Sequence, residues 1–409
     1  MNTPPSPAEW LAAPERATPE EVVAHVVAAA VWAPSVHNTQ PWLFSAGGQE
    51  IRLYADGRRQ LLVADPGGRE MMISCGAALF TARLALRSLG YIPGTCVLPD
   101  PAQPSLVARV SWQRRADPAY YERQLFRCVR QRRTHRGGFD PLPLAPELLA
   151  TLQTGAQRDG ALLRIITSAG SRAALGAVVE TAERAMRLDG AHVQELARWV
   201  SPPGSTRADG VPATAYPARP ERTDPPFPGR DFAHGHRWGL PGFSFGAAAR
   251  SAGVVCLLAT ADDRPADWVN AGQALQRVLL TCASCGVAAA LHSQPLELPW
   301  LREYICAHWC DGTYPQLLLR LGTVPQAAAR GARVAFEVDG TDEAAHTGWS
   351  VLVRGEAVEV TDPAELARLR KIRLSPSAPG AKNRYVRILP AKLTGRRISA
   401  PGDPAHRSG

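Results

Sequence analysis

The sequence predicts an α/β or α+β fold that is built from two related halves. Segments with helical periodicity alternate with short apolar runs typical of strands, which is the pattern of mixed folds. Two apolar helical segments also share the pattern Gly-x-Ala-Leu, at 76–79 and 272–275, and each reaches a closing glycine fourteen positions after the first. We interpret this spacing as an internal duplication with halves at about 20–115 and 120–322. Chance similarity between two ordinary helices is the alternative.

The composition predicts a globular protein with a packed core and no membrane span. Of the 409 residues, 45% are hydrophobic and 20% are charged. No stretch approaches the roughly 20 consecutive apolar residues of a membrane helix. Residues 1–17 are rich in Pro and Ala and lack the pattern of a secretion signal. We therefore expect a flexible N-terminus (1–19), a cytoplasmic location and no membrane partner.

The formal net charge of +9 favours anionic partners, and most of the excess is arginine. A fixed phosphate site is one explanation, and a nucleic-acid surface is the other. We expect no nucleic acid, because the chain lacks the aromatic-rich basic strands of single-strand binders. The eight cysteines do not form a disulfide framework. Cys282-Ala-Ser-Cys285 has redox spacing but lies in an apolar helical run without a nearby histidine, so we expect buried thiols and no metal.

The first helix has the clearest boundaries. Thr18 as N-cap, Pro19 at N1 and Glu21 at N3 form a capping box, and Pro34 ends the helix near Ala33. The other expected elements are a hairpin (42–44 and 51–54), a helix (70–89), strands (95–98 and 105–112), a helix from Asp117-Pro118 to Gly137-Gly138, helices (145–157 and 171–188) around a strand (162–167), a strand (254–259), a helix (267–285) and strands (287–291 and 316–321).

Residues 201–242 differ in composition from the rest of this region. The segment holds nine prolines, and it can hardly be a helix or a central strand. Loops of this length are usually functional lids or disordered insertions, and both interpretations stay open.

Two short polar stretches are the candidate binding elements. In the loop 33–42, Ser35, Asn38 and Gln40 can donate to a planar heterocycle, while two prolines stiffen the backbone. A structural Asx-type turn is the alternative. The run Arg132-Arg133-Thr134-His135-Arg136 suits a phosphate, because arginine binds phosphate bidentately; a solvated basic helix end is the alternative.

Together with several weaker blocks, these stretches resemble the Acg-type branch of the nitroreductase family. The matching segments lie at 33–42, 65–70, 74–79, 132–136, 268–280 and 315–320. The resemblance implies an α+β, nitroreductase-like fused pseudo-dimer over residues 20–325, with a central sheet and flanking helices. The first half has the polar loop and the second half has the arginine run, so one composite FMN site in a monomeric chain is implied; further association through the tail stays open.

The resemblance assigns cofactor-binding roles residue by residue. Arg132, Arg133, Thr134 and Arg136 would hold the phosphate of FMN, with Arg320 as a weaker candidate, and Pro34, Ser35, Asn38 and Gln40 would face the isoalloxazine ring. No protein acid or base is implied, because the flavin itself carries the hydride. For His37 we favour a structural hydrogen bond over a contact with flavin or substrate.

The implied activity is FMN-dependent oxidoreduction, with hydride passing from NAD(P)H to a small acceptor such as a nitro compound or a quinone. The alternative is a non-catalytic protein that binds or sequesters FMN beneath a lid, and the Pro-rich segment 201–242 is where such a lid would lie.

The last part of the chain, 331–400, has a different pattern. Strands are expected at 334–340, 348–357 and 386–398, with a helix near 363–371 that is capped by Asp362-Pro363. The segment resembles the C-terminal half of a pyridoxamine 5′-phosphate oxidase-like split barrel, and the first half of that barrel is missing. Such a half leaves strand edges unpaired, so we expect a remnant of gene fusion that packs on the body, pairs with another chain or is poorly ordered. We assign it no second FMN site.

Overall fold

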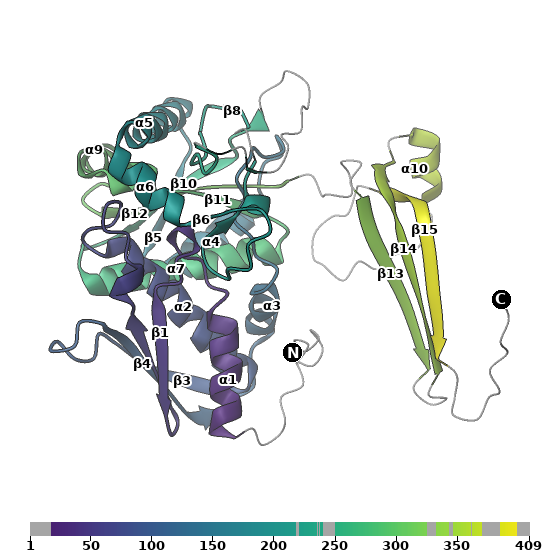
Figure 1. Ribbon diagram of the computed structural model, residues 1–409, viewed down its shortest axis with the longest axis horizontal. Helices are drawn as coiled ribbons and strands as arrows, with labels where there is room; N and C mark the ends of the chain where they lie inside the picture. The colour runs from purple at the N-terminus through teal and green to yellow at the C-terminus, as the bar shows by residue number, and fades with distance from the viewer. Residues whose placement is uncertain are drawn as a thin grey trace. The chain divides into compact units, whose positions relative to one another are not determined.

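Two long helices, α2 (Arg69–Ser88) and α7 (Pro265–Ser284), lie side by side in the middle of the larger part of the molecule (Figure 1). The structure is a computed structural model that describes residues 18–217, 221–234, 236, 238–239, 250–324, 333–342, 347–360, 362–369 and 385–398. The chain divides into two compact units, 1–323 and 324–409. The expected flexible N-terminus lies outside the described residues, apart from its last two positions.

The larger unit contains the same sheet twice. The first sheet has the order β1 (Trp42–Gly47), β2 (Glu50–Ala55), β4 (Leu106–Arg115), β3 (Tyr91–Val97), and the second has the order β5 (Leu162–Ile166), β10 (Val254–Thr260), β12 (Tyr314–Gly322), β11 (Ala288–His292). All neighbouring strands are antiparallel. In both halves the long helix follows the second strand of its sheet, and the third and fourth strands come after it. This shared connectivity confirms the α+β fold and the fused pseudo-dimer, with two four-stranded sheets in place of one central sheet.

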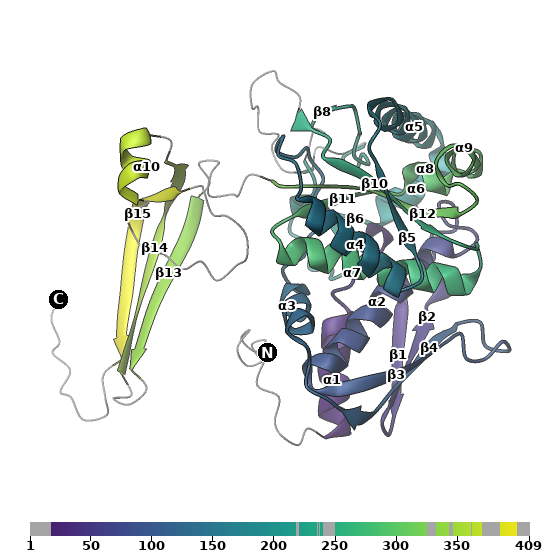
Figure 2. The ribbon, with the colours of Figure 1, turned by 180° about the vertical axis from the view of Figure 1, so that it is seen from behind.

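The sheets enclose the helices in layers (Figures 1 and 2). The first sheet packs on α2 and on α1 (Pro19–Ala30), and the second packs on α7 and on α4 (Pro146–Arg158). On the second sheet, Leu258 and Leu319 face α7, while Leu257 and Leu318 face the opposite side. That side is covered by α5 (Ala169–Leu188), α8 (Gln294–Glu297) and α9 (Pro299–Trp309).

The two duplicated glycines explain how the halves join. A Cβ atom on Gly76 would lie 2.1 Å from the carbonyl oxygen of Val269, and one on Gly272 would lie 1.9 Å from the carbonyl oxygen of Ile73. Each glycine therefore admits the backbone of the opposite helix. The Gly-x-Ala-Leu pattern thus marks the point where α2 and α7 cross, at the seam of the pseudo-dimer.

Most expected elements are present close to their expected bounds. The capping box of α1 forms, with Thr18 N donating to Glu21 at 2.8 Å and Glu21 N donating to Thr18 Oγ1 at 3.3 Å. The sequence analysis missed α8, α9 and α6 (Gly190–Arg198), which is capped by Asp189. None of the described helices is both long and apolar enough to cross a lipid bilayer.

One expected element is wrong in its extent. Helix α3 (Tyr120–Cys128) ends well before Gly137, so Arg132 to Arg136 do not lie on a helix. The carbonyl of Cys128 closes a turn by accepting from Gln131 N and Arg132 N. Thr134 then pairs with Ala289 on the edge strand β11, in a parallel bridge. This pairing with a distant strand ends the helix, although the arginines continue its apparent pattern.

Short elements follow α6. They are β6 (Val200–Ser201), β7 (Val211–Pro212), β8 (Thr223–Asp224) and β9 (Arg250–Ser251). Parts of the Pro-rich segment, 218–220, 235, 237 and 240–242, lie outside the described residues.

The smaller unit holds the expected strands and helix. β13 (Arg333–Asp342), β14 (Thr347–Glu359) and β15 (Val386–Ile398) form one antiparallel sheet in that order. Helix α10 (Pro363–Leu369) begins where expected, and Glu365 N donates to the Asp362 carboxylate at 2.8 Å.

Candidate functional site

The polar loop between α1 and β1 has an unusual backbone. His37, Asn38 and Gln40 have φ angles of 49°, 55° and 50°, in the left-handed region that non-glycine residues rarely adopt. Ser35 Oγ accepts from Gln40 N at 3.0 Å, and Ser35 O accepts from Asn38 N. Such conformations cost about 1–3 kcal/mol each and persist only where the surroundings enforce them, often at ligand sites. The loop is therefore held in a fixed, strained shape.

Part of the Pro-rich segment lies directly over this loop. Asn38 Nδ2 donates to the carbonyl of Gly210 at 2.9 Å, and Gln40 Nε2 donates to the carbonyl of Ala208 at 2.8 Å. Arg59 Nη1 joins both sides, since it donates to Thr39 O at 2.9 Å and to Asp209 at 2.8 Å. We call residues 207–210 the cover segment. Its carbonyl groups thus accept hydrogen bonds from the two side-chain amides that we expected to face a flavin ring.

In the arginine run, two side chains turn inward. Arg132 and Arg136 are half-buried. Burial lowers the pKa of each to about 10, and the charges of Arg133 and Arg136 are a second cause for Arg132. Arg132 Nε is shielded and has no hydrogen-bond partner among the residues that the structure describes. Arg136 donates to Ala215 O at 2.8 Å, and its guanidinium lies 5.2 Å from the ring centre of Phe232. Among the described residues neither arginine is paired with a carboxylate.

Arg133 turns the other way. Its Nη1 donates to the carbonyls of Arg130 and Arg132 at 2.6 and 2.8 Å, and its guanidinium lies 5.5 Å from the ring centre of Trp32. Arg133 is exposed, so the structure does not bring it together with the inward-facing pair. Thr134 is fixed by its backbone bridge to β11.

Arg320 is enclosed by protein atoms. It is only 2% exposed, and burial lowers its pKa to about 10. Nε donates to His292 Nε2 at 2.8 Å, Nη1 to Ala252 O at 2.9 Å and Nη2 to Gly137 O at 3.2 Å. All three nitrogens are thus engaged, and the bond to Gly137 fixes the end of the arginine run. Its geometry is that of a positioning residue.

Phe232 joins the two candidate stretches, and nothing in the sequence marked it. The ring of His37 meets the ring of Phe232 edge-on, with centres 5.7 Å apart, and Arg136 covers the same phenyl ring. Burial lowers the pKa of His37 well below its usual value, and the positive charges of Arg230 and Arg136 lower it further. His37 is therefore a neutral ring. It packs against Phe232, and Arg136 of the arginine run contacts the same phenyl ring.

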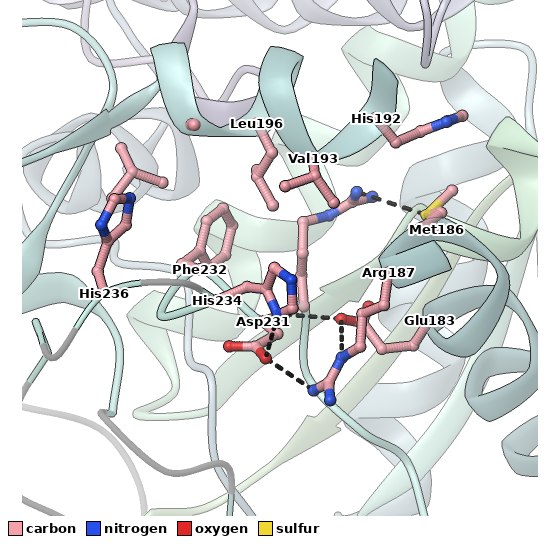
Figure 3. Close-up of a pocket in the computed structure, with 13 residues that line it drawn as sticks. Glu183, Met186, Arg187, His192, Val193, Leu196, Asp231, Phe232, His234 and His236 are labelled. Carbon is pink, nitrogen blue, oxygen red and sulfur yellow. Dashed lines mark hydrogen bonds and ion pairs between the residues drawn. The ribbon is translucent and has the colours of Figure 1, made fainter. Parts of the chain in front are cut away.

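A pocket lined by Phe232 lies between α5, α6 and residues 230–234 and 236 (Figure 3). Its apolar wall includes Met186, Val193 and Leu196. Its polar lining is Glu183, Arg187, His192, Arg230, Asp231, His234 and His236. Sequence analysis missed this pocket, because its residues come from two helices and from the Pro-rich segment without a motif.

A buried carboxyl group, that of Glu70, lies at the start of α2. It belongs to the segment 65–70, one of the segments that carry the resemblance to the nitroreductase family. Glu70 is 4% exposed, and its Oε1 accepts from Arg69 at 2.9 Å, while its Oε2 has no partner in the described part of the chain. Burial raises the pKa of Glu70 well above its usual value, and the negative charge of Glu297 raises it further. At neutral pH this carboxyl group is held in surroundings that favour its protonated form.

Replacing Glu70 with Gln should remove a pH dependence of stability. A carboxyl group whose pKa is higher in the folded state binds more protons there, so the free energy of unfolding falls as pH rises from 4.5 through the folded pKa. We expect Glu70→Gln to flatten this fall and to match or exceed the parent stability above pH 7. Urea unfolding between pH 5 and 9 measures it, with Glu303→Gln on the exposed surface of α9 as control. An unchanged pH slope in Glu70→Gln would contradict the assignment.

Comparison with known proteins identifies the family. A protein of Mycobacterium tuberculosis named "Putative NAD(P)H nitroreductase Rv3131" is 34% identical over 310 residues, which are 75% of this chain and 86% of that protein. "Putative NAD(P)H nitroreductase acg" of the same organism is 27% identical over 320 residues, 76% of this chain and 92% of that protein. An FMN-bound nitroreductase structure from Bacteroides fragilis aligns with 49% of this chain and 89% of its own, at 10% identity and a TM-score of 0.28, too low to establish a shared fold.

The end of the chain matches a different family. The family model described as pyridoxamine 5′-phosphate oxidase matches residues 307–397, from within α9 to the end of β15. This match bears out the resemblance of the tail. Because the smaller unit spans only residues 324–409, most of the 310 and 320 residues that match the relatives above lie in the larger unit. The chain therefore belongs to the Acg-type nitroreductase family of oxidoreductases.

Proposed function

We propose that this chain binds one FMN between the loop 34–41 and the segment 132–136, and that it uses FMN to oxidise NAD(P)H. The observation that carries the proposal is the inward-facing pair Arg132 and Arg136. Both side chains are half-buried, and Arg132 Nε is shielded from water. Within the described part of the chain, no carboxylate accompanies either arginine and Arg132 Nε has no hydrogen-bond partner. A shielded charge without a counter-ion is costly, so the pair favours a bound anion.

The chemistry of the pair suits a phosphate monoester. Arginine stays protonated even with a pKa near 10, so both side chains are cations at neutral pH. Their N–H groups can make charge-assisted hydrogen bonds to phosphate oxygens. Thr134 stands between them in the chain and can add a hydroxyl donor, while Arg133 and Arg320 are engaged elsewhere.

The ring of the flavin would be held by Pro34, Ser35, Asn38 and Gln40. The strained loop supports this assignment, because it presents these residues in a fixed conformation. The amides of Asn38 and Gln40 now bond to the cover segment, so they would reach a ring only when that segment shifts. The bound cofactor would supply hydride transfer, and the protein would position it and limit the access of water.

The names of the relatives support NAD(P)H as the reductant and a nitro compound as one acceptor; a quinone is a second acceptor of the same redox class. The alternative function is sequestration of FMN without turnover. The cover segment favours it, since five hydrogen bonds fasten residues 208–210 to the loop or to Arg59 beside it.

The visible spectrum of the purified full chain tests the proposal. We expect flavin absorption, or its appearance when FMN is added, at a stoichiometry of one FMN per chain. Anaerobic NADPH or NADH should then bleach the bands, and a nitroaromatic or a quinone should restore them. Bands that persist with both dinucleotides would favour sequestration, and a chain that takes up no FMN would refute the site.

Asp209→Ala tests whether the cover segment limits access. The change removes the ion pairs of Asp209 with Arg59 and Arg207, which are partly exposed and worth about 0.2–1 kcal/mol each. We expect trypsin to cut after Arg207 roughly two- to thirtyfold faster, in line with the loss of both ion pairs. Acceptor turnover should rise if the cover limits it. Glu180→Ala, which removes an exposed ion pair with Arg184 on α5, is the control. Equal cleavage rates in both variants would show that the ion pairs do not hold the cover.

A further inference from the structure

Arginine and aromatic side chains gather where α1 and α3 end. The two helices lie side by side, since the rings of His25 and Phe126 stack with their centres 5.4 Å apart (Figures 1 and 2). The guanidinium groups of Arg130 and Arg133 lie 5.4 and 5.5 Å from the ring centre of Trp32. Two cations that follow α3 in the chain thus meet at an aromatic ring that follows α1.

The outer face of α3 continues this group of residues. Tyr120, Arg123 and Arg127 are three and four positions apart, so they lie on one side of the helix, while the opposite side packs in the core. Arg123, Arg127 and Arg133 are exposed to solvent. The aromatic rings are exposed as well, Tyr120 by 71% and Trp32 by 38%. We call the following six residues the basic aromatic surface: Trp32, Tyr120, Arg123, Arg127, Arg130 and Arg133.

The positive charge of this surface is not neutralised by ion pairs within the described part of the chain. Arg123 and Arg133 donate to backbone carbonyl groups, and neither they nor Arg127 pair with a described carboxylate. The acidic residue of α3, Glu122, is bonded at 2.9 Å to Arg87 instead, and its side chain is only 14% exposed. A concentration of exposed charge of one sign attracts partners of the opposite sign. The surface therefore favours an anionic partner.

The aromatic residues distinguish between two kinds of anionic partner. Nucleic-acid bases stack on the faces of aromatic rings, but two guanidinium groups already contact the ring of Trp32. Tyrosine and tryptophan favour the boundary between lipid and water, because each combines an apolar ring with a polar group. Clusters of roughly four to eight basic residues are typical of proteins that bind anionic lipids. The surface thus fits a layer of lipid headgroups better than a nucleic acid.

We propose that the basic aromatic surface binds a lipid bilayer that contains anionic phospholipids. The arginines donate to lipid phosphate groups, and the rings of Tyr120 and Trp32 lie among the headgroups. The expectation of no membrane partner rested on the lack of a membrane-spanning segment, and a peripheral contact needs no such segment. The inference goes beyond the proposed function and does not depend on bound FMN.

Sedimentation of the full chain with lipid vesicles tests the inference. One set of vesicles contains phosphatidylcholine alone, and the other contains equal amounts of phosphatidylcholine and phosphatidylglycerol. At low ionic strength we expect the parent chain to bind the anionic vesicles at least roughly tenfold more tightly than the neutral ones, and added salt should weaken the binding. Equal binding to both kinds of vesicle, or binding to neither, would overturn the inference.

A double variant, Arg123→Gln with Arg127→Gln, tests whether this surface makes the contact. One arginine near an anionic membrane is worth about fivefold in binding, so the variant should bind anionic vesicles roughly twenty-five-fold more weakly. Arg109→Gln with Arg158→Gln is the matched control, because it removes two charges from exposed positions on β4 and α4. The control should bind like the parent. An equal loss in both variants would show that net charge attracts the vesicles, which contradicts a specific surface.

A single-stranded oligothymidylate, titrated under the same conditions, separates lipid from nucleic acid. If the parent chain binds the oligonucleotide but not the anionic vesicles, and the Arg123 and Arg127 variant loses that binding, the surface belongs to nucleic acid and the inference is wrong. FMN content is read separately from the visible spectrum. Both variants should match the parent in FMN content, because Arg132 and Arg136 are unchanged. A chain that takes up FMN but ignores anionic vesicles therefore loses only this inference.

Discussion

Replacing both Arg132 and Arg136 with Ala should abolish most FMN binding and leave the chain folded. Hydrogen bonds to charged groups are worth about 1.5–3 kcal/mol each, so losing one from each arginine raises the Kd by roughly two to four orders of magnitude. The cofactor-free variant should be as stable as the parent or more stable, because it no longer partly buries two cations that have no carboxylate partner among the described residues. Fluorescence titration with FMN and thermal unfolding measure the two effects.

The variant should also lose discrimination between flavins. Riboflavin lacks the phosphate, so the parent chain should bind FMN far more tightly than riboflavin, and the double variant should bind both alike. Arg133→Ala is the matched control, because Arg133 lies one position from Arg132 but packs on Trp32 at the surface. If Arg133→Ala weakens FMN binding as much as the double variant does, or if the double variant keeps its preference for FMN, the phosphate site is wrong.

The contrast between Arg132 and Arg133 also shows which parts of the site the sequence could predict. The composition of the run indicated an anion site, but the side that each arginine faces depends on the bridge between Thr134 and Ala289. These two residues are far apart in the chain, and no local pattern encodes their pairing. The same bridge explains why α3 ends at Cys128 rather than near Gly137.

Local signals predicted elements well where their cause was local. The capping box at Thr18 and Glu21 and the helix cap at Asp362 are interactions between residues three apart, and both form. The pocket and Phe232 could not be predicted in this way. Phe232 lies in a Pro-rich segment without periodicity, and its importance comes from His37 and Arg136, two residues of other loops.

The duplicated glycines are the opposite case, because a repeat in the sequence exposed a contact between distant helices. Adding one methyl group there should strongly destabilise the fold. In Gly272→Ala the new Cβ would lie 1.9 Å from the Ile73 carbonyl oxygen and 2.9 Å from Ala77 N. Both neighbours are backbone atoms, so no side chain can rotate away, and α2 and α7 must separate.

We expect Gly272→Ala to lower the free energy of unfolding by about 1–3 kcal/mol or more, which is the usual cost of overpacking a core. Urea unfolding measures the loss. Gly190→Ala is the matched control, since Gly190 begins α6 and a Cβ there meets no atom within 4 Å. Alanine suits a helix better than glycine, so the control should be neutral or slightly stabilising. Equal stability of Gly272→Ala and the parent would mean that the two halves do not meet through these glycines.

Because the candidate site draws on loops from both halves, a separation of α2 from α7 should weaken FMN binding as well, and Gly190→Ala should leave it unchanged.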